Sequence, residues 1–147
     1  MDNLRNEPVT PGETITISSE VEQIDDARRW VTDHARAAGV DDDAIFDLEL
    51  ALTEALANVV AHAYSGEPDH EILLGVVVGD DRVEVSVRDW GRPFDRAAYE
   101  PRDLDDPGEG GYGVYLIDEL MDQVGREPQS DGGTLLTLTK NRKEVLQ

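Results

Sequence analysis

Two polar side chains four residues apart, Glu54 and Asn58, stand in a segment whose apolar residues recur at helical spacing. At about 100° per residue they lie about 40° apart, on the same side of the predicted helix. Their neighbours on that side are small: Ala51, Ala57 and Ala61. A carboxylate and an amide carbonyl are hard oxygen groups suited to Mg²⁺ and its waters. The pair therefore indicates a ligand site, with an ordinary exposed polar helix face as the alternative.

Asp89 and Gly91 form a second candidate, in an Asp-Trp-Gly sequence directly after a valine-rich segment. A carboxylate at the end of a strand can accept a hydrogen bond from the amino group of a base. The glycine has no Cβ and lets a flat ligand approach the backbone closely. Because aspartate and glycine are also common turn residues, an ordinary turn is the alternative interpretation.

A third candidate is the glycine-rich segment 108–113, which stands directly before an apolar segment with helical character. Glycines ahead of a helix N-terminus expose backbone N–H groups to phosphate, and the helix dipole favours the anion. The segment is not a Walker loop, because no Gly-Lys-Ser/Thr follows. Nor does it follow a strand directly, as the turn of a Rossmann fold would. A flexible linker is the alternative, although the helix begins at once and nothing suggests a new domain.

Helices and strands must position these candidates. Strands are expected at 14–17, 72–78, 83–87 and 135–139, and the alternation within 83–87 predicts one face exposed to water. Helices are expected at 21–38, 44–64 and 114–124, the first with Ser18 or Ser19 as N-cap and Gly39 as its stop. The acidic segment 41–43 favours the start of the second helix through the helix dipole.

The loop 89–113 is long for a compact domain, and such loops are usually functional, often lids. The order of elements predicts an α+β fold, a two-layer sandwich with helices on one face of a mostly antiparallel sheet. The domain is expected to span 14–140, between a flexible N-terminal segment, 1–13, and a C-terminal tail, 141–147. No internal repeat or second domain is visible.

The charge of the chain restricts its partners. Its 147 residues carry 33 acidic and 13 basic side chains, a net charge of −20. Such a surface repels nucleic acid and attracts a basic protein, although adaptation to salt is an equally good explanation. The chain has no cysteine, which excludes disulfides and thiolate metal sites. It also has no apolar run of about 18 residues and no signal-like N-terminus, so no membrane span and a cytoplasmic location are expected.

In this order, the motifs resemble those of the GHKL superfamily of gyrases, chaperones, histidine kinases and MutL. Glu54 to Asn58 is similar to its N box, Asp89 to Gly91 to the first glycine box, and Gly110 to Gly113 to the second. Gly132-Gly133-Thr134 is similar to the final Gly-Thr element. Within the superfamily, residues 54–64 and 112–122 resemble the bacterial anti-sigma factor and serine-protein kinase family. The likeness runs from about 14 to 139.

The resemblance implies a histidine-kinase-like ATPase fold that binds ATP and Mg²⁺. Asn58 would coordinate the Mg²⁺ on the phosphates, Glu54 would be the general base, and Asp89 would hold the adenine amino group beside Gly91. Thr134 would support the Asp89 end of the pocket. Three glycines would cradle phosphates under a lid at 92–109: Gly110, Gly111 and Gly113. Many members carry a further glycine where this chain has Pro93, which affects how the first hinge of the lid bends.

The same resemblance implies a protein kinase that phosphorylates a serine or threonine of an anti-anti-sigma (STAS-type) protein and holds a sigma factor inactive. The sequence does not fix the oligomeric state, and a homodimer is one option because dimers are common in the family. A second hypothesis is a nucleotide-dependent binding module without useful kinase activity. Glu54 favours the enzyme, since a pure binder needs no base. A third is a detached catalytic domain of a histidine kinase, which the absence of a histidine-bearing dimerisation helix disfavours.

Overall fold

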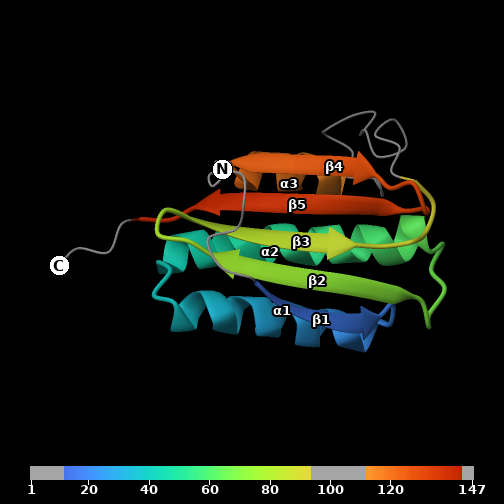
Figure 1. Cartoon of the computed structure of the whole chain (residues 1–147), viewed down its shortest axis with the longest axis horizontal. Coiled ribbons are helices and arrows are strands. Elements are labelled where there is room, and N and C mark those ends of the chain that lie inside the picture. The colour runs from blue at the N-terminus through green and yellow to red at the C-terminus, as the bar shows by residue number, and fades with distance from the viewer. Residues whose placement is uncertain (1–11, 94–111, 144–147) are drawn as a thin grey trace, which may run out of the picture.

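A computed structural model describes residues 12–93 and 112–143 of the chain. They form two layers (Figure 1), with all the described helices on one face of a five-stranded antiparallel sheet of order β1-β2-β3-β5-β4. The elements in chain order are β1 (Glu13–Ser18), α1 (Val21–Ala37), α2 (Asp42–Asn58), the π-helical η2 (Val59–Ala63), β2 (Glu71–Val78), β3 (Arg82–Arg88), α3 (Tyr112–Leu120), β4 (Gln123–Pro128) and β5 (Thr134–Asn141). The predicted α+β two-layer sandwich is confirmed.

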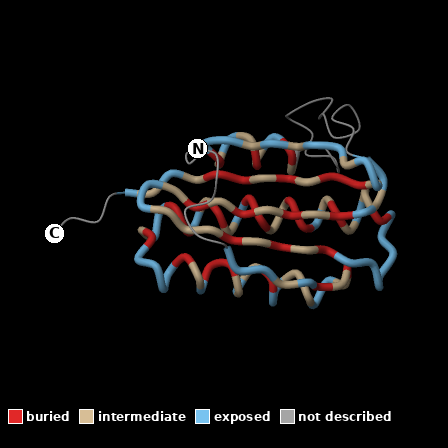
Figure 2. The backbone as a smooth tube through the Cα atoms, in the orientation of Figure 1, coloured by how far each residue is buried: buried red, intermediate tan, exposed pale blue. Residues whose placement is uncertain are grey.

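The core lies between the sheet and α2, the central helix. Along β3, alternate residues are fully buried while those between them stay half-buried, as the predicted alternation requires: Val83, Val85 and Val87 against Glu84 and Ser86. Figure 2 shows the same alternation along the neighbouring strands. The leucines of α2 cover this inner face and are also fully buried: Leu48, Leu52 and Leu56. Burial of this stripe fixes which side of α2 remains for a ligand.

The second helix has a side-chain cap within its acidic start, and the first helix begins at Val21 as predicted but without the predicted cap. The Asp41 side chain caps α2 by accepting a hydrogen bond from the backbone N–H of Ala44 at 3.1 Å. At α1 the N-cap position is held by Glu20 without a side-chain bond, so the prediction of Ser18 or Ser19 is wrong. The Ser19 hydroxyl donates instead to the Glu67 carbonyl at 2.7 Å, which ties it to the turn before β2.

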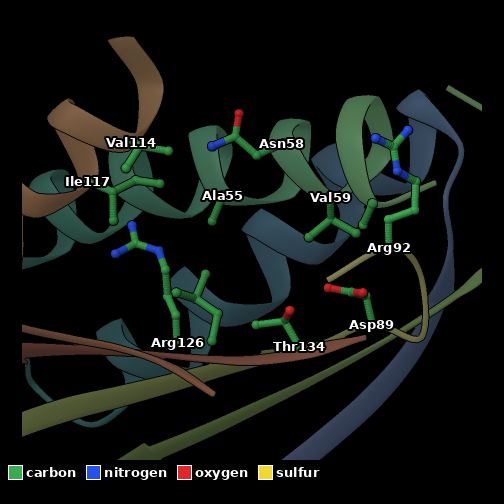
Figure 3. A pocket seen from close by; sticks show the side chains of 11 residues that line it. Ala55, Asn58, Val59, Asp89, Arg92, Val114, Ile117, Arg126 and Thr134 are labelled. Atoms are coloured by element: carbon green, nitrogen blue, oxygen red, sulfur yellow. The ribbon is translucent and has the colours of Figure 1, made fainter. Parts of the chain in front are cut away.

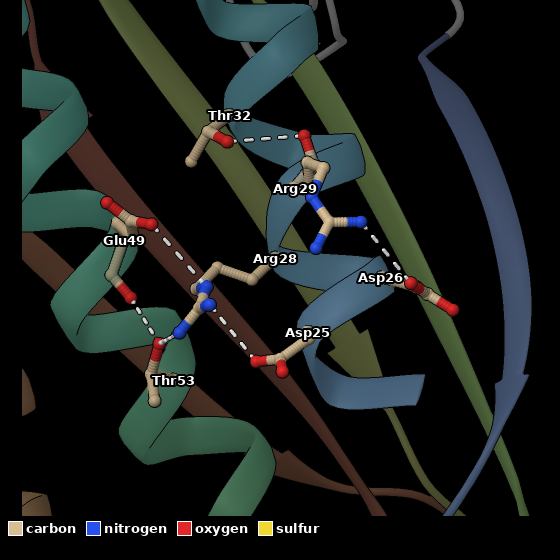
Figure 4. Close-up of polar contacts among 7 residues, drawn as sticks. All are labelled: Asp25, Asp26, Arg28, Arg29, Thr32, Glu49 and Thr53. Atoms are coloured by element: carbon tan, nitrogen blue, oxygen red, sulfur yellow. Dashed lines mark hydrogen bonds and ion pairs between the residues drawn. The ribbon is translucent and has the colours of Figure 1, made fainter. Parts of the chain in front are cut away.

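An ion-pair cluster joins the exposed sides of α1 and α2 (Figure 4). The Arg28 guanidinium of α1 lies 3.0 Å from Asp25 on its own helix and 3.4 Å from Glu49 of α2. It also donates to the Thr53 hydroxyl at 3.5 Å. Half-exposed pairs of this kind add little stability singly, so the packing of α1 against α2 does not depend on them.

Both predicted ends of the third helix are wrong. The helix begins at Tyr112 instead of 114 and ends at Leu120 instead of 124. Val124 belongs to β4, which is not among the predicted strands. This edge strand has only two half-buried side chains, Val124 and Arg126, and it contains Gly125 and Pro128, so no apolar alternation marks it. The second helix does continue past Asn58, but as the widened turn η2. No helix among the described residues is long and apolar enough to cross a membrane.

Candidate functional site

An open cleft lies between the helical layer and the sheet, where β3 ends and β5 begins (Figure 3), with about 450 Å³ of empty space that includes its solvent-filled mouth. Its walls are mainly apolar, with a few polar side chains that converge on the space between them. This is the usual character of a small-molecule site. The lining residues come from α2, η2, the loop after β3, α3, β4 and β5: Ala55, Asn58, Val59, Ala63, Asp89, Arg92, Val114, Ile117, Arg126, Thr134 and Leu136.

Asp89 is the buried acid of this cleft, with 4% of its surface exposed. Its Oδ1 accepts a hydrogen bond from the backbone N–H of Gly91 at 2.9 Å, and its own backbone N–H donates to the Thr134 carbonyl at 3.1 Å. Burial raises the pKa of Asp89, and hydrogen bonds from the backbone N–H groups of Gly91 and Thr134 offset only part of that rise. The carboxylate is therefore held in one orientation inside an apolar cleft, where a ligand donor would stabilise its charge.

The turn before β5 packs directly against Asp89, and this explains its two glycines. Gly133 has a φ of +79°, and a Cβ there would overlap the Asp89 carbonyl. The Arg88 guanidinium fastens the turn by donating to the carbonyls of Asp89 and Gly132 at 2.7 and 2.8 Å. The same side chain pairs with Asp131 at 2.6 Å. The Gly-Gly-Thr sequence thus brings Thr134 into the cleft beside Asp89.

Gly91 lies against the end of η2. A Cβ on Gly91 would overlap the carbonyl of Ala63, at the end of η2, and the backbone N–H of Arg92 donates to that carbonyl at 2.9 Å. Gly91 does not line the cleft. The space left by its missing side chain is filled by the chain itself, so Gly91 contributes by letting the segment after β3 pass close to the helix end.

Tyr64 holds the Asp89 segment in place, and sequence reasoning missed it. The buried hydroxyl accepts a hydrogen bond from the backbone N–H of Trp90 at 2.8 Å and donates to the Glu71 carbonyl at 2.6 Å. The ring stacks on His70 at 4.5 Å. One side chain therefore joins the end of η2, the start of β2 and the end of β3. The only signal in the sequence is an aromatic residue with a hydroxyl at the end of a helical segment.

Replacing Tyr64 with Phe keeps the ring but leaves the Trp90 N–H without this acceptor. We expect the free energy of unfolding to fall by about 1–3 kcal/mol, the cost of a buried group left unsatisfied. Urea unfolding of the two proteins measures this loss, and the slope of the transition should stay the same because the exposed surface does not change. Coincident unfolding midpoints would show that the hydroxyl does not hold the loop.

Glu54 and Asn58 share one side of α2, as their spacing predicts, and both lie against the start of α3. A Cβ on Gly113 would stand 2.6 Å from Oε1 of Glu54 and 3.6 Å from the amide atoms of Asn58, so a side chain at this position would displace the flexible end of Glu54. Gly113 lies inside the first turn of α3 and not before it. Gly110 and Gly111 lie outside the described residues, as does the predicted lid apart from Arg92 and Pro93.

The small residues around the cleft differ from those predicted. Ala57 and Ala61 are exposed and Ala51 is buried, and none of them lines the cleft. The small residues that line the cleft are Ala55 and Ala63. They lie on a side of the helix that is closer to the buried leucine stripe than the side that carries Glu54. Asn58 is therefore in the cleft, and Glu54 stands beside it at the α3 side.

The charged groups of the cleft are unusual for so acidic a protein. Of the described residues that line it, two are arginines, Arg92 and Arg126, and one is an acid, Asp89, although the chain as a whole carries −20. Positive charge thus outweighs negative charge among these described lining residues, which favours an anion. Among the described residues, no group of three or more His, Asp or Glu side chains could hold a metal ion by itself.

Comparisons with known proteins agree with this geometry. The family model described as a histidine kinase-like ATPase domain matches residues 17–140. The serine-protein kinase RsbW of Listeria monocytogenes serovar 1/2a is 34% identical over 142 residues, which cover 90% of this chain and 89% of the relative. RsbW of Bacillus velezensis is 36% identical over 132 residues, covering 84% and 81%.

A crystal structure of the RsbU and RsbW domains of a Mycobacterium tuberculosis protein has the same fold. Its TM-score is 0.66 at 22% identity, over 94% of this chain and 35% of that one. The chain belongs to the histidine kinase-like ATPase domains and, among them, to the RsbW family of serine-protein kinases. The superfamily and family predicted from the motifs are confirmed. Kinases with such a domain use a nucleotide, so a nucleotide is the ligand that this fold takes.

Proposed function

We propose that this protein binds ATP in the cleft, transfers its γ-phosphoryl group to a serine or threonine of an anti-anti-sigma (STAS-type) protein, and holds a sigma factor inactive. The observation that carries the proposal is the arrangement of three side chains. Asp89 stands buried at one part of the cleft, Asn58 lines another, and Glu54 lies beside Asn58. The adenine of ATP would lie at Asp89, its phosphates would lie near Asn58, and the reacting hydroxyl of the substrate would lie at Glu54.

The apolar walls and Asp89 suit adenine. Val59, Val114, Ile117 and Leu136 offer apolar surface to both faces of a flat ring. The Asp89 carboxylate would accept a hydrogen bond from the exocyclic amino group, and Thr134 lies next to it. The phosphates would then extend toward Asn58 and the start of α3, where the N–H groups of Gly110, Gly111 and Gly113 are proposed to cradle them.

Asn58 suits a magnesium ion carried by the nucleotide. Its amide oxygen is a hard ligand, and Mg²⁺ in kinases is usually held by one or two protein oxygens together with phosphates and water. Among the described residues, no group of three or more His, Asp or Glu side chains could hold a metal ion, which fits an ion that arrives with ATP better than a resident one. When bound, the ion would neutralise charge on the phosphates.

Glu54 is placed to act as the base. In the transfer, the substrate hydroxyl oxygen bonds to the γ-phosphorus while the bond from that phosphorus to the β–γ bridging oxygen breaks. The hydroxyl proton passes to the Glu54 carboxylate, and ADP leaves with the bridging oxygen. Glu54 lies beside the cleft and not inside it, so it would not contact the adenosine. That position favours the kinase over a binding module that only needs nucleotide.

The acidic surface suits the proposed partners. Sigma factors bind DNA and carry basic regions, so a protein of charge −20 presents them with a complementary field. Phosphorylation adds roughly two negative charges to the anti-anti-sigma protein, which weakens its binding to the acidic kinase. The two partners would compete for one surface, near the lid and α1, in the cytoplasm, where transcription takes place. A homodimer is part of the same proposal.

Competition binding with immobilised protein tests the switch. The unphosphorylated anti-anti-sigma protein should displace sigma in the presence of nucleotide, and its phosphorylated form should not. Association with sigma should slow as salt rises, because screening shortens to about 8 Å at physiological ionic strength. Equal displacement of sigma by both forms would contradict the switch, even if the phosphoryl transfer itself is observed.

A further inference from the structure

Arg126 occupies a position in the sheet that its neighbours give to apolar residues. On β4 it lies opposite Leu136 of β5, and Val124 lies opposite Leu138. Both leucines are buried between the sheet and the helices. The register therefore places the Arg126 side chain on the covered face of the sheet, under α3. A charged guanidinium is unexpected in this layer, because apolar side chains fill the equivalent positions around it.

An acid on α3 orients the Arg126 side chain. Its side chain is 14% exposed and lies 3.3 Å from Asp118 of α3, whose side chain is 31% exposed. A partly exposed ion pair of this kind adds little stability. Stability alone therefore does not explain an arginine at this position. What distinguishes the position is that Arg126 borders the cleft, with Val114 and Ile117 of α3 above it.

Figure 3 shows Arg126 and Asp89 at opposite ends of the cleft, with Thr134 and Ala55 between them. One end offers an acceptor and the other end offers donors. Adenine has the matching pattern: its amino group is a donor, and N3, on the opposite edge of the ring, is an acceptor. If Asp89 takes the amino group, as the proposed function has it, the N3 edge faces Arg126.

We propose that Arg126 is a specificity-determining residue that donates a hydrogen bond to N3 of the adenine ring, with Asp118 as its positioning partner. This proposal rests on ATP binding in the cleft. It has a consequence for base selection. Guanine carries an amino group next to N3, and that donor would meet the donors of Arg126. The cleft would then reject guanine at both ends, since Asp89 repels the guanine carbonyl oxygen.

The experiment compares Kd values of ATP and 3-deaza-ATP, in which a C–H group replaces N3, for the wild-type protein and Arg126→Met. Wild type should bind ATP at least about tenfold more tightly than 3-deaza-ATP, the size of a charge-assisted hydrogen bond. In Arg126→Met that ratio should fall to about one. Asp118→Asn should give a ratio between the two, because it loosens the guanidinium without removing it.

Three controls distinguish recognition of the adenine ring from an effect of Arg126→Met on the fold or on the net charge. 7-Deaza-ATP lacks a ring nitrogen beside the amino group, and Arg126→Met should leave its Kd ratio to ATP unchanged. Arg82→Met removes an equal charge from an arginine of β3 that pairs with Asp81 and Glu84, and it should keep the wild-type preference for ATP. 2-Amino-ATP places a donor beside N3, so wild type should reject it and Arg126→Met should accept it.

The outcomes are distinguishable. If wild type binds no adenine nucleotide, the proposed function fails. If wild type binds ATP and 3-deaza-ATP equally well, or if the ratio is the same in wild type and Arg126→Met, the contact with N3 does not exist although ATP binding stands. The wild-type ratio alone decides the matter should Arg126→Met not fold. The assignment would also be overturned if Arg126→Met changed the Kd ratio of 2′-deoxy-ATP to ATP and left the ratio of 3-deaza-ATP to ATP unchanged. Arg126 would then contact the ribose 2′-hydroxyl and not N3.

Discussion

Replacing Glu54 with Gln should lower the rate of phosphoryl transfer by about 10²–10⁴-fold, the usual contribution of a general base. Glutamine keeps the length and the hydrogen-bonding reach of the side chain, but it cannot take up the proton of the attacking hydroxyl. The Kd of ATP should stay within about twofold, because Glu54 does not line the cleft. Single-turnover transfer with labelled ATP measures the rate, and a separate titration measures Kd.

Two further variants make this result specific. Glu49→Gln changes an acid on the same helix that pairs with Arg28 at 3.4 Å and does not border the cleft, so it should keep the rate of transfer. Asn58→Ala should weaken binding of ATP in the presence of Mg²⁺, because it removes a ligand oxygen from the cleft. An equal loss of nucleotide affinity in Glu54→Gln and Asn58→Ala would show that Glu54 is structural and not the base.

The parts of the site that the sequence predicted are those determined by local periodicity. Helical spacing alone places Glu54 and Asn58 on one side of α2, and Gly113 stands against both. The alternation of valines along β3 places Asp89 where the strand ends. Each of these positions depends on a repeat of 2 or 3.6 residues within a single element, so a fold is not needed to find it.

The parts that were missed depend on contacts between elements distant in sequence. Tyr64 bonds to Trp90 across 26 residues, and Gly91 faces Ala63. No local pattern encodes either approach. Arg126 was missed for a second reason, because β4 is an edge strand without apolar alternation and its first residues were assigned to a helix. Edge strands with glycine, proline and charged side chains are commonly hidden in this way, since these features protect an edge from pairing with other chains.

Replacing Asp89 with Asn should raise the Kd of ATP by about 10–100-fold, the equivalent of about 1.5–3 kcal/mol for a hydrogen bond to a charged group. Preference for ATP over GTP should fall by a similar factor, because the neutral amide no longer selects an amino group. Asp131→Asn is the matched control: it removes an exposed acid that pairs with Arg88 in the neighbouring turn. An Asp89→Asn protein that prefers ATP over GTP as strongly as the parent would contradict this assignment of the adenine contact.

The raised pKa of Asp89 also gives this contact a pH dependence with a definite sign. Burial raises the pKa of the folded carboxyl above the ordinary value of about 3.9. In the free protein, its contribution to stability is therefore complete below that ordinary value and is lost as pH rises through the folded pKa. Adenine needs the ionised form.

The Kd of ATP should accordingly rise as pH falls through the raised pKa of Asp89, beginning above the range in which an ordinary aspartate titrates. Protons also bind to ATP itself in acid, and the Asp89→Asn protein meets the same ligand without the carboxyl. The difference between the two pH profiles thus isolates Asp89. Parallel profiles for parent and variant would show that the buried carboxyl does not hold the nucleotide, whatever the size of the affinity loss at neutral pH.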